Sequence, residues 1–233
     1  MGILSPDYEM MDKVSAVVDE VNAWYKAELA INHDIDDIQA LAEMLNIQTI
    51  KFQLPIEWFV YDDKRATTTE WLSAAACTGK MIKNGKTLHS NHLEVILWEN
   101  NLEGKWGPIT FKELVMQMIG HETIHFNQFS RIGYDRLNDL KSGHQKGLQL
   151  FNKTGEEHDY MQCYLRDPHE LMAYGHDLAA EIRRVSDPAK ALRNPEAFKN
   201  ELLVYEQYRD IFPPNSKPLQ KLLSYAARYT ECS

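Results

Sequence analysis

The segment His121-Glu122-Thr123-Ile124-His125 constrains this chain more than any other feature of its sequence. At about 100° per residue, side chains four positions apart project from the same face of an α-helix, one turn apart. Two neutral imidazoles in that arrangement can hold one zinc ion, and Glu122 would lie beside the water that the metal carries. The segment therefore predicts a helix with a single zinc ion, and hydrolysis of an amide bond by an activated water.

The surrounding residues predict that this helix is long and mostly buried. Thr110 and Glu113 have the spacing of a capping box at its start, and Gly133 suits its end. Apolar residues recur at helical spacing after the start: Phe111, Leu114, Val115, Met118 and Ile119. The two histidines would then lie inside the protein, with Gln128 on the same stripe as a hydrogen-bonding partner. The alternative is a chance match, because H-E-x-x-H also occurs in proteins that bind no metal.

Composition narrows the class of protein. The chain has 233 residues and a formal net charge of −9, so nucleic acid and anionic membranes are not expected partners. No apolar run approaches the ~20 residues that span a bilayer, and the start of the chain lacks the pattern of a secretion signal. Three widely spaced cysteines argue against a disulfide framework and favour a reducing compartment, so we expect a cytoplasmic protein.

The hydrophobic periodicity predicts helices first, then a small sheet, then the metal-site helix and a helical remainder. We expect helices at 8–30 and 36–45, and strands at 49–54, 57–61, 77–82, 86–89 and 93–98. Asn84-Gly85 is a hairpin signal. The order is typical of an α+β fold with a mostly antiparallel sheet, in one domain over 1–233 whose two parts are 1–108 and 109–233. Strand 93–98 is either an edge strand that can pair with an extended peptide or an interior strand.

Catalytic zinc usually has three protein ligands, and two residues compete for the third place. Glu170 follows Asp167 and Pro168, which suit the cap and first turn of a helix, and Glu170 would face inward from that turn. The alternative role for Glu170 is the second member of a capping box with Asp167. The other candidate ligand is His144, in a segment that the flanking Gly143 and Gly147 mark as a polar loop.

Two motifs together resemble a known family. His121-Glu122-x-x-His125-x-x-Gln128, followed by Tyr164-Leu165-x-Asp167-Pro168-x-Glu170-x-x-Ala173-Tyr174, is similar to the gluzincin zinc metallopeptidases. More narrowly, the pair resembles small phage-encoded zincin-like proteins, and the resemblance covers residues 109–184. It implies a zincin core that cleaves peptides or proteins, in the cytoplasm of the host cell if phage-encoded.

The resemblance also implies roles for individual residues. His121, His125 and Glu170 would be ligands of one zinc ion, and Glu122 the general base. Gluzincins have an aspartate four residues after the ligand glutamate, and this chain has Tyr174 there, so we expect Asp177 to replace it. The oxyanion donor would be one of three residues: Tyr164, Tyr174 or His176. We take Tyr174 as the catalytic candidate.

Two alternatives remain open at this point. Gly143-His144, followed by Phe151-Asn152-Lys153-Thr154-Gly155, resembles the SprT-like proteases, which act on protein bound to nucleic acid. The acidic composition and the lack of a cysteine-rich ribbon count against that resemblance. The second alternative is a zincin scaffold without activity, serving as a structural or interaction protein of a phage. An intact Glu122 favours the enzyme, because a purely structural metal site needs no carboxylate beside the water.

Overall fold

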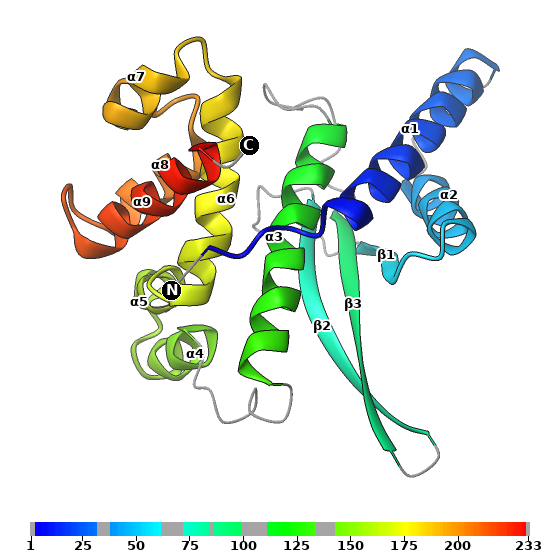
Figure 1. Cartoon of the computed structure of the whole chain (residues 1–233), viewed down its shortest axis with the longest axis horizontal. Helices are drawn as coiled ribbons and strands as arrows, with labels where there is room; N and C mark the ends of the chain where they lie inside the picture. Colours follow the sequence, from blue (N-terminus) through cyan, green and yellow to red (C-terminus); the bar gives the residue numbers. More distant parts are fainter. Residues whose placement is uncertain are drawn as a thin grey trace. The chain divides into compact units, whose positions relative to one another are not determined.

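The computed structural model describes residues 3–31, 38–61, 72–83, 86–98, 111–133 and 143–231. Within these ranges the fold is α+β, mostly helical with one three-stranded mixed sheet (Figure 1). Contacts divide the chain into two compact units, one of residues Pro6–Phe126 and the other of Met1–Ser5 with Asn127–Ser233. The boundary falls within helix α3 (Phe111–Ile132), whereas the sequence analysis divides its single domain at residue 108.

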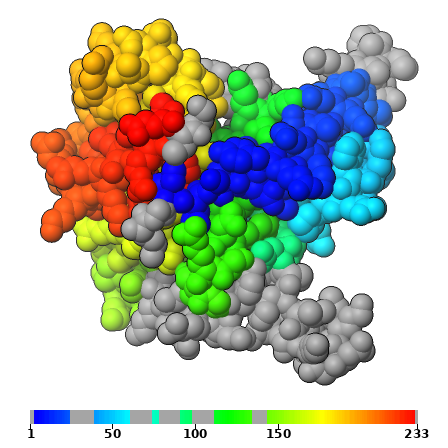
Figure 2. All heavy atoms as spheres, in the orientation of Figure 1, coloured from blue at the N-terminus to red at the C-terminus, as the bar shows by residue number. Residues whose placement is uncertain are grey.

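Two helices begin the unit of residues 6–126: α1 (Tyr8–Ile31) and α2 (Ile38–Lys51). The prediction of a helix at 8–30 is confirmed. One stripe of α1 is completely buried, at the spacing of a helical face: Val14, Val17, Val18 and Val21. An ion pair between Lys51 and Glu20 joins the exposed sides of the two helices at 2.9 Å. In the space-filling view α1 and α2 form one continuous surface (Figure 2).

The strand predicted at 49–54 is wrong, because α2 continues through Lys51. The alternation of apolar residues there would bury Ile50, but Ile50 is 76% exposed and Thr49 is only 1% exposed. Thr49 instead extends the helical stripe of Leu45, four residues earlier, and its hydroxyl donates to the carbonyl of Asn46 at 2.9 Å. Helical and strand periods both fit so short a run, and packing on the helical face decided between them.

The sheet contains β1 (Ile56–Tyr61), β2 (Leu72–Lys83) and β3 (Lys86–Trp98), in the order β1-β3-β2. β3 runs antiparallel to β2 and parallel to β1. The strand predicted at 57–61 is confirmed, and the segments predicted at 86–89 and 93–98 belong to one long strand. Alternate residues of β3 form the buried face: Leu93, Val95 and Leu97 are completely buried. The predicted turn at Asn84-Gly85 lies outside the described residues.

The interior position of β3 settles the alternative left open for residues 93–98. Within residues 93–97, β1 pairs with one side of this strand and β2 with the other, so this segment has no open edge for an added peptide. On β1, the Asn46 side chain bonds to both the N–H and the carbonyl of Trp58, at 3.0 and 2.8 Å. That side chain therefore covers the outer edge of β1. Among the described residues, no strand pairs with the outer edge of β2.

Helix α3 lies beside β2 and β3 (Figure 1) and is largely buried, as predicted. Every residue from Ile119 to Phe126 is buried. The helix ends where Gly133 adopts a left-handed φ of 87°, a conformation that costs glycine little, and its N–H donates to the carbonyl of Phe129 at 3.0 Å. The predicted end of the helix is confirmed, whereas Thr110 of the predicted capping box lies outside the described residues.

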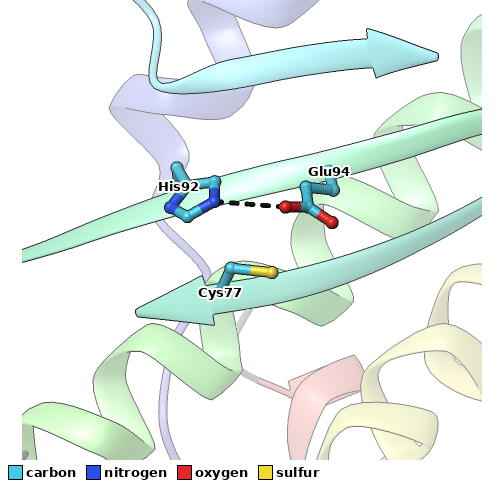
Figure 3. A group of neighbouring side chains, drawn as sticks. All are labelled: Cys77, His92 and Glu94. Carbon is cyan, nitrogen blue, oxygen red and sulfur yellow. Dashed lines mark hydrogen bonds and ion pairs between the residues drawn. The ribbon is translucent and has the colours of Figure 1, made fainter. Parts of the chain in front are cut away.

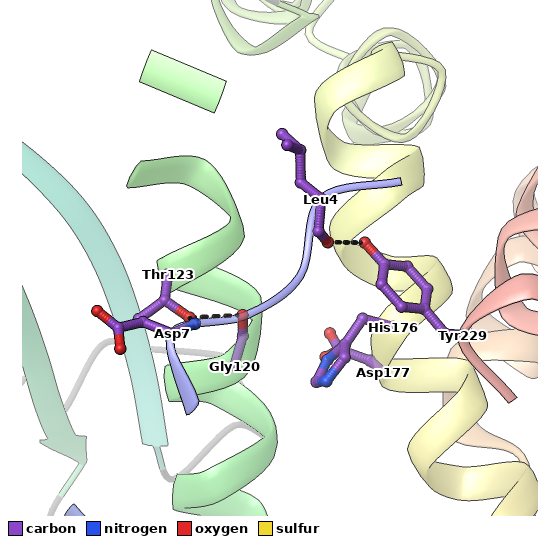
Figure 4. Close-up of polar contacts among 7 residues, drawn as sticks. All are labelled: Leu4, Asp7, Gly120, Thr123, His176, Asp177 and Tyr229. Atoms are coloured by element: carbon purple, nitrogen blue, oxygen red, sulfur yellow. Dashed lines mark hydrogen bonds and ion pairs between the residues drawn. The ribbon is translucent and has the colours of Figure 1, made fainter. Parts of the chain in front are cut away.

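The other unit is helical in all its described elements beyond α3. Its helices are α4 (Gly143–Thr154), α5 (Glu157–Leu165), α6 (Pro168–Arg184), α7 (Pro188–Arg193), a 3-10 helix (Pro195–Phe198), α8 (Leu203–Ile211) and α9 (Lys217–Glu231). Near the N-terminus, the carbonyl of the buried Leu4 accepts a hydrogen bond from the Tyr229 hydroxyl at 2.6 Å (Figure 4). In the described part of the chain, no helix is long and apolar enough to cross a membrane.

Candidate metal centre

Helix α3 brings three side chains of the predicted site together. One potential ligand atom from each of His121, Glu122 and His125 lies within 4.8 Å of the other two, and all three residues are buried. The centroids of the two imidazole rings are 5.1 Å apart, with 67° between the ring planes. Two imidazoles and a carboxylate, buried and converging, form a group that could hold a metal ion, because neutral imidazole and carboxylate both ligate zinc.

Thr123, between the two histidines, is completely buried and ties α3 to the start of α1. Its hydroxyl donates to the carbonyl of Gly120 and accepts the N–H of Asp7, each at 3.1 Å (Figure 4). Asp7 in turn caps α1, where its carboxylate accepts the N–H of Met10 at 3.0 Å. A hydroxyl inside the motif thus holds α3 in place against α1 in the turn that carries the histidines.

Glu122 also contacts the sheet. Its Oε2 accepts the backbone N–H of Ala76, on β2, at 2.8 Å. Ala76 pairs with Leu93 across the β2–β3 ladder, and its N–H points away from β3, toward α3. A hydrogen bond from a rigid strand limits the rotation of the carboxylate, so Glu122 is preorganised beside the two imidazoles.

This contact has no direct signature in the sequence, because backbone N–H groups leave no trace in residue identity. The only available signal was indirect. Strand residues alternate in the direction of their N–H groups, so every edge strand presents a row of outward donors. Which donor meets Glu122 depends on how β2 lies against α3.

Cys77, the residue after Ala76, is also influenced by the charge of the Glu122 carboxylate. Burial raises the pKa of the Cys77 thiol above its ordinary value, and nearby Glu94 and Glu122 raise this pKa further. A thiol in that setting is protonated at neutral pH when no metal is bound, so it is a poor nucleophile. This argues against covalent cysteine catalysis next to Glu122.

Asp167 caps helix α6 as predicted. Its carboxylate accepts the N–H of His169 at 2.9 Å, and Pro168 occupies the first turn. The backbone N–H of Asp167 donates to the carbonyl of Tyr164 at 3.0 Å. In a capping box the Asp167 N–H would donate to the Glu170 carboxylate. Because it donates to Tyr164, this bond argues against a purely capping role for Glu170.

Glu170 lies in a cluster of tyrosines instead. Tyr164 lies beside Glu170 and Tyr174, and the rings of Tyr164 and Tyr174 pack edge to face with centroids 6.3 Å apart. Burial raises the pKa of Tyr164, and Tyr174 and the negative charge of Glu170 raise this pKa further. Tyr164 therefore keeps its hydroxyl proton at all ordinary pH values, next to the Glu170 carboxylate.

The other predicted polar residues of α6 are buried near its middle. The carboxylate of Asp177 lies 3.3 Å from Nδ1 of its neighbour His176, and the His176 ring packs edge to face on Tyr229 (Figure 4).

Gln128, on α3, is 2% exposed and donates its side-chain N–H to the carbonyl of His169 at 3.0 Å. Within its unit, Gln128 thus holds the start of α6, two residues after the Asp167 cap.

His144 does not lie in a loop, as predicted, but in the first turn of α4. Its exposed side chain bonds through Nδ1 to the Tyr160 hydroxyl at 2.8 Å. The flanking glycines serve close packing of helices α4 and α5. A Cβ on Gly143 would lie 2.5 Å from the carbonyl oxygen of Cys163, and one on Gly147 would lie 2.7 Å from the Tyr160 ring. Glycine therefore marks a helix contact here, and the prediction of a loop is wrong.

The predicted site residues are divided between the two units. His121, Glu122 and His125 belong to the unit of residues 6–126, where they converge. Glu170, Tyr174 and His144 belong to the other unit. The roles of Glu170 as a metal ligand and of Tyr174 as a catalytic residue therefore remain predictions.

Replacing Asp167 by alanine should lower the free energy of unfolding by about 1–2 kcal/mol at neutral pH, because α6 loses its cap. Burial tends to raise the pKa of Asp167, but bonds from His169 and from the N–H of Gly143 outweigh it and lower this pKa. The stabilisation is therefore complete above the unfolded value of about 4 and is lost as pH falls through the lower folded value. Urea titrations at neutral and acidic pH test this. Exposed Asp210→Ala is the control, and an equal loss in both variants would contradict the expectation.

Comparison with models of protein families, with curated proteins and with solved structures gave no match.

Proposed function

We propose that this chain is a zinc-dependent peptidase in which Glu122 is the general base. The observation that carries the proposal is the buried group of His121, Glu122 and His125 on α3, with Glu122 held by the N–H of Ala76. Burial of two histidines and a carboxylate at one point is costly unless they serve a common ligand or hydrogen-bond network. A divalent cation is the ligand that suits such donors.

The donor set fits zinc. His121 and His125 would supply two imidazole ligands, and we propose Glu170 as the third protein ligand, which leaves one position for water or substrate. Zinc bound there would lower the pKa of a coordinated water and polarise the substrate carbonyl. The position of Tyr164 beside Glu170 supports this role, because ligating carboxylates are usually oriented by a neighbouring hydrogen-bond donor.

Glu122 would move the proton. With Oε2 bonded to Ala76, the carboxylate would accept the proton of the attacking water and then deliver that proton to the leaving amine. Tyr174, whose ring packs edge to face on Tyr164, is our candidate for donating a hydrogen bond to the oxyanion that forms on the substrate carbonyl.

The outer edge of β2 suits an extended peptide as the substrate. Backbone groups alternate along a strand, so those of Ala74 and Thr78 point to the same side as the N–H of Ala76. A peptide that pairs with Ala74 or Thr78 on this edge would reach Glu122, whose carboxylate occupies the N–H of Ala76 between them. Residues 93–98, one candidate for such an edge from the sequence, form an interior strand, so we propose the edge of β2 instead.

The function is tested with a complex mixture of peptides and mass spectrometry. Zinc-loaded protein should generate new peptide ends, and both chelation and the Glu122→Gln substitution should abolish them. If the loaded protein leaves every peptide intact while it retains zinc at His121 and His125, the alternative of a metal-binding scaffold without activity is favoured.

Glu170→Ala should weaken zinc binding by more than about 100-fold, beyond the 10–100-fold typical of residues that only support a ligand. His144→Ala should leave the affinity unchanged, because exposed His144 is bonded to Tyr160. Competition with a chromophoric chelator measures both affinities. Tyr164→Phe is the matched control, since it removes the hydroxyl next to Glu170 but retains the carboxylate. The reverse result, with His144 essential and Glu170 dispensable, would favour the SprT-like alternative.

A further inference from the structure

A second group of metal-ligating side chains lies on the sheet, apart from the two histidines of α3. Cys77 of β2 pairs directly with His92 of β3, and Glu94 is two residues further along β3 (Figure 3). Paired residues share a face, as do residues two apart on one strand. All three side chains therefore project from the face of β3 opposite to the buried Leu93 and Val95.

The distances suit coordination of one ion. A nitrogen of His92, the sulfur of Cys77 and a carboxylate oxygen of Glu94 all lie within 4.8 Å of one another. His92 Nε2 and Glu94 Oε1 are 3.4 Å apart. Two ligands at about 2.0–2.1 Å from a tetrahedral zinc are separated by roughly 3.3–3.4 Å, so this pair already has the spacing that the metal requires.

The chemistry of the three donors narrows the choice of metal ion. Thiolate and imidazole favour zinc over magnesium or calcium, which prefer oxygen ligands alone. The side chains of His92 and Glu94 are 34% and 45% exposed, so an ion can reach them and a water can complete a tetrahedron. The simpler alternative is an ion pair of His92 with Glu94 beside an unrelated cysteine.

We propose that Cys77, His92 and Glu94 form a second zinc site, which joins β2 to β3 next to Ala76. Ala76 precedes Cys77 and donates its N–H to Glu122. A metal that ties the two strands together at Cys77 would hold this N–H in position for Glu122. The site itself does not depend on the proposed peptidase activity.

Cobalt binding tests the site, because a thiolate ligand produces an intense charge-transfer band in the near ultraviolet and histidine or carboxylate ligands do not. The full chain, freed of metal, is titrated with Co²⁺. We expect two equivalents in the wild type, with the thiolate band, and one equivalent without this band in Cys77→Ser. His121→Ala should keep the band and lose the other equivalent.

The chain offers a matched control. It contains only three cysteines, so a variant with Cys163 and Cys232 replaced by serine retains Cys77 alone and should keep the full band. If Cys77→Ser fails to fold, His92→Ala provides the second test and should weaken cobalt binding at the thiolate site by more than about 100-fold.

The outcomes separate this site from the proposed function. Absence of the thiolate band from the wild type, or its persistence in Cys77→Ser, would overturn the sheet site. If His121→Ala instead retained both metal equivalents and the thiolate band, the peptidase proposal would be overturned and the sheet site would stand.

Discussion

Replacing His121 by alanine should remove one zinc ion per chain and reduce peptide hydrolysis to background. The remaining imidazole of His125 would have to hold the ion without the partner that lies one helical turn away, with ring centroids 5.1 Å apart. Metal analysis after dialysis against metal-free buffer measures the loss, and peptide cleavage is followed on the same sample. Zinc in the sheet site is expected to remain, so the content should fall from two equivalents to one.

His158→Ala is the control for this substitution. His158 is an exposed residue of α5, so its removal changes the histidine count but no predicted ligand. Both variants should fold. Shortening the His121 side chain to alanine leaves the hydrogen bonds of Thr123 with Asp7 and Gly120 in place. Two equivalents of zinc in His121→Ala would contradict the assignment of His121 as a ligand.

Glu122→Gln should lower kcat/KM by about 10²–10⁴-fold while the zinc content and the folded state are retained. Glutamine is similar in size, and its side-chain carbonyl can still accept the N–H of Ala76, so the contact between α3 and β2 is preserved. It cannot accept the proton of the attacking water. The defect should therefore lie in the chemical step, with a small effect on KM.

The matched control is Glu113→Gln, the same chemical change at an exposed position of the same helix. It should leave hydrolysis unchanged. Thermal unfolding and metal analysis of both variants show whether any loss of activity has a structural origin. Turnover by Glu122→Gln at the wild-type rate would exclude Glu122 as the base, even if zinc at the site proved essential.

The sequence by itself determined features that depend on neighbouring residues along the chain. The helix at 8–30, the end of α3 at Gly133 and the cap of α6 at Asp167 were all predicted correctly. Each arises from a helical period, or from a side chain or turn that bonds to the backbone a few residues away. The same locality places His121 and His125 on one face of α3, because four residues make about one turn.

Tertiary structure decided whatever depends on partners distant in sequence. Residues 49–51 fit a strand or a helix by period alone, and burial of Thr49 selected the helix. Glycines that suggest a loop around His144 instead allow α4 to pack closely on α5.

The sites show the same division. The H-E-x-x-H motif names Glu122, but only the position of β2 against α3 brings the N–H of Ala76 to its carboxylate. Cys77, His92 and Glu94 form a group only because the β2–β3 register pairs Cys77 with His92. A shift of one residue in that register would send Cys77 to the opposite face from the other two, and no local pattern in the sequence specifies the pairing.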